Sequence, residues 1–240
     1  MIEGSRSSGR AGRDAGGPLL IEIMGPAGSG KTTLIRALCS QHEGIHAGLD
    51  LTKAEYVFPS LRRLGVFLPV WALHHRRDRW LDRLEMRGIA RLETWSRALK
   101  RPTTANDAVA LFDHGPLYRL ASLREFGPEL TESESFERWW RGSLTWWLNA
   151  LDIVVWLDAP DAVLLQRIDE RGHWFLGGDH PLEEKHEFLA RYRRAFSAIL
   201  QGTGEMPTVH RFRSDQASVP TIAAEVLNAI QDRRTDAIRS

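Results

Sequence analysis

The sequence predicts an α/β fold in which a parallel β-sheet carries helices on both faces. Short apolar segments alternate with amphipathic segments along the chain, which is the pattern of β-α-β crossovers. Residues 19–24 and 151–157 form almost uninterrupted apolar runs, as expected for strands buried on both sides. Four residues stand at or just past predicted strand ends, namely Gly25, Asp50, Asp113 and Asp158. Sheets of this type bind ligands beyond the carboxyl ends of their strands.

The expected elements follow one another without an internal repeat. Strands are expected at residues 19–24, 45–51, 108–112, 151–157 and 208–212. Helices are expected at residues 33–41, within 60–101, and at 117–126, 132–150, 162–171, 181–200 and 219–230. We expect Pro69 and Gly88 to break or kink the region 60–101, and Asp161 to cap the helix beside it.

The composition is that of a globular protein. The 240 residues carry a net charge of +1, with 42% hydrophobic and 26% charged residues. Such a balance gives no overall basic field and argues against nucleic acid as a partner. No apolar run reaches the ~20 residues needed to span a bilayer, so no membrane association is expected. Cys39 is the single cysteine, which excludes an intrachain disulfide and favours a cytoplasmic location.

Residues 1–17 are rich in Gly, Ser and Arg, and we expect them to form a disordered leader. They lack the apolar core of a secretory signal. A transit peptide is the alternative, although the segment has no obvious amphipathic helix. Residues 18–240 are expected to form one globular domain.

The segment GPAGSGKT, residues 25–32, has the sequence of a phosphate-binding loop. It lies between a strand and a helix, so glycine-rich backbone and the amino end of that helix can point N–H groups at a phosphate. Lys31 can reach the β- and γ-phosphates of a nucleotide, and the Thr32 hydroxyl can ligate Mg²⁺. The nucleotide is expected to contact Gly25, Ala27, Gly28, Ser29, Gly30, Lys31, Thr32 and Thr33.

Asp113 stands at the end of the third strand and is the main candidate for a catalytic carboxylate. A carboxylate there can orient Mg²⁺ or accept a proton from an attacking hydroxyl, and capping of the next helix is the alternative. Thr32 and Asp113 are therefore the expected metal ligands. Asp50 is a second candidate base, with Glu55 behind it.

Arg167 and Arg171 are four residues apart, so they share one face of a helix next to a glycine-rich loop, residues 172–179. Two guanidinium groups on a mobile lid can close over transferring phosphates and stabilise their charge. The alternative is a salt-bridged surface helix, because Asp169 and Glu170 lie between the two arginines.

Together these segments resemble the nucleoside and nucleotide kinases of the P-loop class, and thymidylate and deoxynucleoside kinases in particular. The resemblance is carried by GPAGSGKTT, LFDHG, LDIVVWLDAP and RIDERG followed by PLEEKHEFLARYRRAF, spread over residues 25–196. It implies a three-layer P-loop fold with five parallel strands in the order 2-3-1-4-5 and a helical lid. It also implies that Arg167 and Arg171 are lid arginines and that the loop of residues 214–218 packs against adenine.

One position departs from that family. Its members commonly have Asp-Arg or Glu-Arg at the end of the third strand, where the arginine meets the acceptor's phosphate. Here the pair is Asp113-His114, and a neutral imidazole is a poorer phosphate clamp than arginine. The departure favours a hydroxyl acceptor on a nucleoside, sugar or antibiotic-like molecule, unless Arg119 or Arg124 replaces the missing arginine.

The expected activity is Mg²⁺-dependent transfer of the ATP γ-phosphoryl group to a small-molecule acceptor, which is a nucleoside, a nucleotide or a hydroxylated metabolite. The expected catalytic residues are Lys31, Asp50, Asp113, Arg167 and Arg171. One alternative is a kinase for nucleic-acid ends, in which the basic helices of residues 60–101 form a groove. Another is an ATPase or switch without an acceptor. The sequence does not decide between ATP and GTP as the phosphate donor, although it has no guanine-reading Asn-Lys-x-Asp motif. Exposed tryptophans of the helix around residues 139–147 are expected to offer a homodimer face.

Overall fold

The computed structural model describes residues 17–49, 81–100, 108–171, 181–201 and 206–239. The strands of these ranges form one five-stranded parallel sheet in the order β2-β3-β1-β4-β5, which confirms the predicted topology. The strands are β1 (Leu19–Met24), β2 (Ile45–Ala47), β3 (Val109–Asp113), β4 (Ile153–Asp158) and β5 (Thr208–Arg213).

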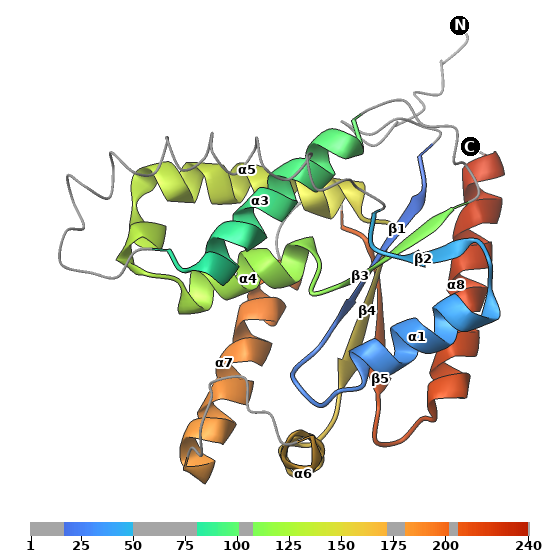
Figure 1. Ribbon diagram of the computed structural model, residues 1–240. Coiled ribbons are helices and arrows are strands. Elements are labelled where there is room, and N and C mark those ends of the chain that lie inside the picture. Colours follow the sequence, from blue (N-terminus) through green and yellow to red (C-terminus); the bar gives the residue numbers. More distant parts are fainter. Residues whose placement is uncertain (1–16, 50–80, 101–107, 172–180, 202–205, 240) are drawn as a thin grey trace, which may run out of the picture.

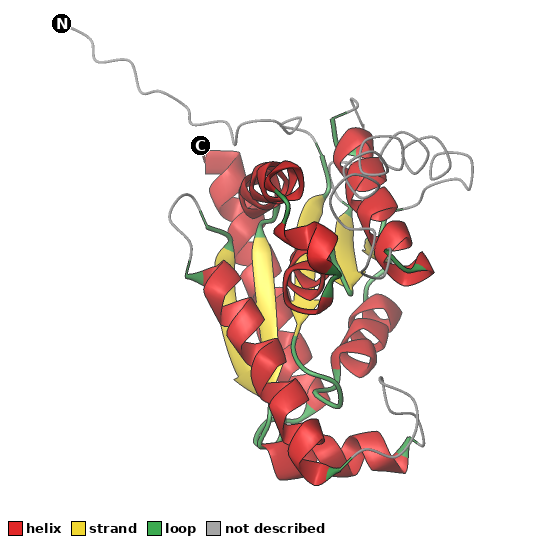
Figure 2. Ribbon diagram, turned by 90° about the vertical axis from the view of Figure 1, so that its left-hand side faces the viewer, coloured by secondary structure: helices red, strands yellow, loops and turns green. Residues whose placement is uncertain are grey.

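Helices cover both faces of the sheet, as the sequence predicts (Figures 1 and 2). One face carries α1 (Lys31–Gln41) and α8 (Val219–Arg239). The other face carries α3 (Arg83–Ala98), α4 (Pro116–Phe126), α5 (Glu134–Ala150) and α7 (Leu182–Leu200). A short 3-10 helix, Glu129–Glu132, precedes α5. The remaining helix, α6 (Asp161–Glu170), lies beside the loop between β1 and α1 (Figure 1).

β1 is central in the sheet and contacts both apolar layers. Ile21 and Ile23 belong to the core that α1 and α8 cover, whereas Leu20 and Met24 belong to the core on the opposite face. All four side chains are buried, which explains why this strand reads as an apolar run. Glu22 is the one polar residue in the strand, and it is also fully buried.

Two local predictions are wrong. Gly88 does not break its helix, because α3 runs without interruption from Arg83 to Ala98. A Cβ atom at Gly88 would make only an ordinary contact, 3.5 Å, with Arg119 Nη1 of α4. Asp161 does not cap α6 either. It is the first residue of that helix, Pro160 occupies the cap position, and the Asp161 carboxylate instead contacts two residues of α7.

The tryptophans of α5 pack into the protein. Trp139 and Trp147 are buried, so the expected dimer face of exposed tryptophans is wrong for these two residues. Trp140 and Trp146 are partly buried, and each lies under a cationic side chain. Packing therefore accounts for the tryptophan-rich sequence of this helix.

Several predicted features fall outside the described residues. They are Asp50, Glu55, residues 60–80 of the basic helices and the glycine-rich loop of residues 172–179. Of the helices that the structure describes, none is both long enough and apolar enough to cross a membrane.

Candidate active site

The loop after β1 is shaped by glycines that its surroundings require. Gly25 has φ +146°, and a Cβ atom there would lie 2.0 Å from the carbonyl oxygen of Leu157 in β4. Gly28 has φ +79°, and a Cβ atom there would lie 2.7 Å from the carbonyl oxygen of Leu164 in α6. The loop thus passes closer to β4 and α6 than any residue with a side chain would allow.

The loop leads directly into the amino end of α1. Gly30 is the cap residue, with φ +94°, and it caps the helix without a side-chain hydrogen bond. The first N–H groups of α1 are therefore left for another acceptor, and a phosphate is the acceptor that such a helix end suits best.

Lys31 holds its ammonium group against the loop. Its Nζ donates to the carbonyl oxygens of Gly25, at 2.8 Å, and Pro26, at 2.9 Å. Burial lowers the pKa of Lys31 to about 8; the nearby Asp113 carboxylate opposes this shift, and Arg171 adds to it. The ammonium group therefore lies where it could contact a phosphate bound in the loop.

Asp113 and the loop meet at the end of β3. The Thr32 hydroxyl donates to Asp113 Oδ2 at 2.9 Å, and His114 Nδ1 lies 3.1 Å from Asp113 Oδ1. Burial opposes ionisation of Asp113, but His114, Thr32 and Lys31 outweigh it and hold the pKa of the carboxyl below its usual value. The two predicted metal ligands are therefore neighbours, and the carboxyl group is ionised at neutral pH.

His114 has a strained backbone. Its φ of +53° lies in the left-handed region that residues with side chains rarely adopt. The imidazole packs edge-on against the ring of Tyr118, with centroids 4.4 Å apart. Strain of this kind persists only where the surrounding structure holds both ends of the segment.

Glu22 is the site-related residue that the sequence reading missed. Its carboxylate accepts hydrogen bonds from the backbone N–H groups of Leu117 and Tyr118, each at 2.8 Å, in the first turn of α4. Burial raises the pKa of Glu22 to about 7, although both N–H groups and the charge of Arg119 favour its ionised form. The available signal was a single acid inside an otherwise apolar strand.

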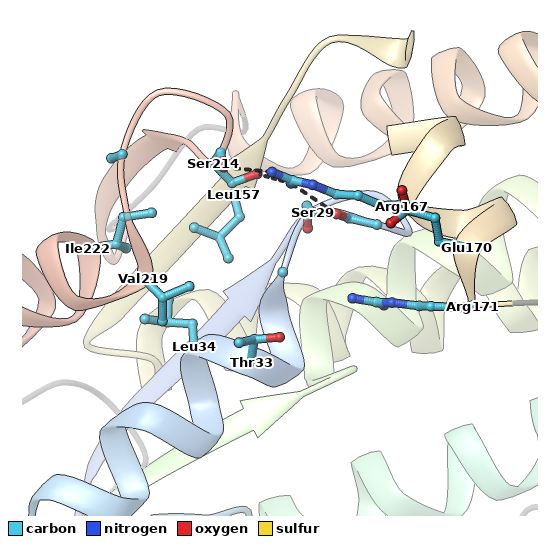
Figure 3. A pocket seen from close by; sticks show the side chains of 13 residues that line it. Ser29, Thr33, Leu34, Leu157, Arg167, Glu170, Arg171, Ser214, Val219 and Ile222 are labelled. Atoms are coloured by element: carbon cyan, nitrogen blue, oxygen red, sulfur yellow. Dashed lines mark hydrogen bonds between the residues drawn. The ribbon is translucent and has the colours of Figure 1, made fainter. Parts of the chain in front are cut away.

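A cavity of about 450 Å³ lies between the phosphate loop, α6 and the segment that joins β5 to α8 (Figure 3). Apolar side chains of Leu34, Leu157, Val219 and Ile222 form part of its wall. The remaining lining residues come from the loop, the first turn of α1, the end of α6 with its cap residue, and the β5–α8 segment: Gly28, Ser29, Gly30, Thr33, Arg167, Glu170, Arg171, Ser214 and Ala217. Its position next to the phosphate loop suits the base and ribose of a nucleotide.

Arg167 and Arg171 both line this cavity, but their surroundings differ (Figure 3). Arg167 donates to Ser214 Oγ and to the Ser214 carbonyl oxygen, each at 3.0 Å, and to the carbonyl oxygen of Gly28 at 3.3 Å. It therefore bridges the phosphate loop and the β5–α8 segment. Arg171 lies close enough to Lys31 to lower the pKa of that lysine, so its charge acts at the phosphate side.

Arg193 of α7 anchors α6 to the sheet. Its guanidinium donates to both carboxylate oxygens of Asp158, at 3.0–3.2 Å, and to the carbonyl oxygen of Ala159 at 2.9 Å. It also donates to Asp161, whose other oxygen lies 2.7 Å from His186 Nδ1. This network holds the start of the helix that carries Arg167 and Arg171, and sequence reasoning did not find it.

The two arginines proposed as substitutes for the missing one lie in different places. Arg124 pairs with Glu137 and stacks on Trp140, on the α4–α5 side of the molecule. Arg119 lies 5.6 Å from the ring centre of Trp95 in α3, and its charge reaches Glu22.

The oxygen groups of Thr32 and Asp113 suit Mg²⁺, which prefers oxygen ligands and completes its shell with substrate phosphates and water. Within the described ranges, no three His, Cys, Asp or Glu side chains come together as a complete metal site. A Mg²⁺ ion at Thr32 and Asp113 would thus need a bound nucleotide for further ligands.

Comparisons with known proteins agree with this fold. No family model matches the chain, and no curated protein matches it. Among solved structures, a thymidylate kinase from Candida albicans is similar over 90% of this chain and 93% of its own, with 15% identity and a TM-score of 0.52. A deoxyadenosine kinase from M. mycoides, solved with dCMP and dCDP, is similar over 89% of this chain and 99% of its own, with 16% identity and a TM-score of 0.50. The chain therefore shares the fold of P-loop nucleoside and nucleotide kinases.

Proposed function

We propose that the protein is a kinase that transfers the γ-phosphoryl group of ATP, as its Mg²⁺ complex, to a hydroxyl group of a small molecule. The observation that carries the proposal is the 2.9 Å contact between the Thr32 hydroxyl and the Asp113 carboxylate. It brings an ionised acid to the end of a phosphate-binding loop, where donor and acceptor would meet. The fold shared with thymidylate and deoxyadenosine kinases supports the same class of reaction.

The roles of the donor-side residues follow from their positions. The N–H groups of the loop and of the start of α1 bind the phosphates, together with Lys31. Thr32 and Asp113 hold Mg²⁺, which neutralises charge on the phosphates when the nucleotide is bound. Arg171 adds positive charge near Lys31 and stabilises the charge that spreads over the transferred group.

The cavity beside the loop takes the base and ribose of the donor. Its apolar wall of Leu34, Leu157, Val219 and Ile222 offers a flat base a dry surface. Arg167 and Ser214 close one side of this cavity (Figure 3). We propose adenine as the base, and a GTP competition experiment distinguishes the two purines.

The acceptor presents a hydroxyl group without a phosphate next to it. The amino end of α4 follows Asp113 closely and would be a natural phosphate site. However, Pro116 has no N–H, and the N–H groups of Leu117 and Tyr118 already donate to Glu22. His114 stands where the similar kinases commonly have arginine. Both observations favour a nucleoside or another hydroxylated molecule over a nucleotide.

Asp113 is our proposed base for the acceptor hydroxyl as well as a metal ligand, and Asp50 and Glu55 remain candidate bases. From the sequence we also propose a cytoplasmic location, a homodimer and a single domain of residues 18–240.

The test is transfer of labelled phosphate from Mg²⁺-ATP to a panel of nucleosides, nucleoside monophosphates, sugars, aminoglycosides and oligonucleotides. We expect one hydroxylated small molecule to take up label, and expect Lys31→Ala and Asp113→Asn to abolish this uptake while the circular dichroism spectrum stays unchanged. Two outcomes would contradict the proposal: full activity of Lys31→Ala, or an ATPase rate that no acceptor changes. Salt-sensitive labelling of oligonucleotides alone would instead favour a nucleic-acid kinase.

A further inference from the structure

Glu22 is a buried carboxylate in the strand that leads to the phosphate loop. Its exposed fraction is 0%, and Leu20 and Met24, on the same face of β1, are apolar. A carboxylate in such a place is costly unless hydrogen bonds compensate its lost hydration. The groups that Glu22 binds therefore indicate what it does.

Those groups belong to the first turn of α4. The N–H groups of Leu117 and Tyr118 each donate to one oxygen of Glu22 at 2.8 Å. The carboxylate thus satisfies the amino end of the helix and puts negative charge at its positive pole. β1 holds the start of α4 directly.

The same contacts control the segment that carries Asp113. Only His114 and Gly115 separate Asp113, at the end of β3, from Pro116, at the start of α4. Asp113 is paired with Ile23 in the β1–β3 ladder, and a Cβ atom at Gly115 would lie 2.6 Å from Glu22 Cδ. β1 therefore holds this short turn on both sides, by strand pairing before it and by Glu22 after it.

The turn would relax without its second anchor. The left-handed backbone of His114, with φ +53°, costs about 1–2 kcal/mol relative to an ordinary conformation. If α4 moved away from Glu22, His114 could leave this conformation, and the neighbouring Asp113 would turn with it. The 2.9 Å contact between Asp113 and Thr32 would then be lost.

We infer that Glu22 is the positioning residue for Asp113. It acts through the amino end of α4 and the strained turn, and it touches neither the nucleotide nor the acceptor. The inference rests on the proposed kinase function, because Asp113 is the active-site group that it positions.

Glu22→Gln tests the inference, because glutamine keeps the size of the side chain but offers one acceptor oxygen to the two N–H groups. Asp152→Asn is a matched control. Asp152 is also buried, with 7% exposure, and its carboxylate also accepts a backbone N–H, that of Leu20, at 2.8 Å. This contact lies at the opposite end of β1 from the phosphate loop.

Two measurements compare the variants with the wild type. One is steady-state transfer to the acceptor found by the labelled-phosphate screen. The other is calorimetric binding of ATP with and without Mg²⁺. For Glu22→Gln we expect kcat to fall about 10- to 100-fold, which is the range for a slightly misplaced catalytic group, and the KM for ATP to rise by no more than the factor by which Mg²⁺ strengthens ATP binding in the wild type. Its ATP binding should also lose the strengthening by Mg²⁺, and Asp152→Asn should keep both properties.

Wild-type kcat in Glu22→Gln, or an equal fall in Asp152→Asn, would overturn the inference. Should Glu22→Gln not fold, Gly115→Ala is the second variant: its Cβ atom would collide with Glu22 Cδ and with Phe112 Cβ, each at 2.6 Å, so it disturbs the same turn and must give the same loss of kcat and of Mg²⁺-dependent ATP binding. The proposed function fails separately, if the wild type transfers phosphate to no acceptor and Mg²⁺ does not strengthen its ATP binding. If Mg²⁺ strengthens ATP binding in the wild type and still does so in Glu22→Gln, only the role of Glu22 is contradicted.

Discussion

Arg167 holds Ser214 through two hydrogen bonds of 3.0 Å, one to the hydroxyl and one to the carbonyl oxygen. Ser214 follows β5, and Arg167 also reaches the Gly28 carbonyl oxygen in the phosphate loop. One guanidinium thereby joins the two sides of the cavity. Arg171, one turn further along the chain, carries its charge near Lys31 and lowers the pKa of that lysine. The two arginines predicted to form a lid thus have different surroundings.

This difference predicts separate kinetic effects. Arg167→Ala should raise the KM for ATP about tenfold, the equivalent of ~1.4 kcal/mol, with a small effect on kcat, because it loosens the donor cavity. Arg171→Ala should lower kcat about 100-fold or more, because it removes charge needed in the transition state. Initial-rate kinetics over a range of ATP concentrations check both. If the two variants changed KM and kcat equally, Arg167 and Arg171 would not have these separate roles.

Thr32 and Asp113 should act as a unit in metal binding. Thr32→Ala and Asp113→Asn should each remove most of the strengthening of ATP binding by Mg²⁺, and the double variant should be hardly worse than either one. Thr32→Ser keeps the hydroxyl and should bind as the wild type does. Calorimetric titration at several Mg²⁺ concentrations gives the coupling. Fully additive effects would mean that the two residues bind the metal independently.

Glu22 should make stability depend on pH in an unusual direction. Its pKa is raised from 4.5 to about 7 in the folded protein. The folded state therefore binds a proton between these values that the unfolded state releases. The stabilising contribution is complete below pH 4.5 and is lost as the pH rises through 7. At ~1.4 kcal/mol per pKa unit, the loss is about 3 kcal/mol.

Urea denaturation from pH 4.5 to 8 checks this expectation. As the pH rises, the unfolding free energy of the wild type should fall relative to that of Glu22→Gln, because glutamine does not titrate. Asp152→Asn serves as the reference for the other titrating groups. A constant difference over the whole range would show that Glu22 stays in one protonation state.

Replacing glycine by alanine should have opposite effects on stability at two positions. Gly25→Ala should destabilise the protein by more than about 2 kcal/mol, because its Cβ atom would collide with backbone rather than with a movable side chain. Gly142, in α5, has open space at the Cβ position, so Gly142→Ala should stabilise the protein by about 0.5–1 kcal/mol. Thermal unfolding of both variants measures these changes. A stable Gly25→Ala variant that still binds ATP would contradict the loop geometry.

Sequence reasoning succeeded where the local pattern decides the structure. The limits of β1 were predicted correctly because its side chains are buried on both faces, which leaves an apolar run between recognisable turns. The neighbourhood of Thr32 and Asp113 also followed from the pattern, since adjacent parallel strands end at the same edge of the sheet.

It failed where the partner of a side chain lies far away in the chain. Glu22 meets residues 95 and 96 positions later, and no periodicity signals such a pairing. Gly88 has the character of a helix breaker, but α3 continues through it. Asp161 has the character of a helix cap, but two side chains of α7 compete for its carboxylate. For Glu22 and Asp161, a tertiary contact overrides the local preference.

The position of Glu22 also bears on how the chain reaches its correct fold. If β1 paired with its neighbours one residue out of alignment, every side chain of the strand would change faces. Glu22 would then enter the apolar layer beneath α1 and α8, and the N–H groups of α4 would be out of its reach. An uncompensated buried carboxylate costs several kcal/mol, so misaligned sheets would be rejected during folding. The carboxylate that orients the turn at Asp113 would thus also favour the correct register of β1 in the sheet.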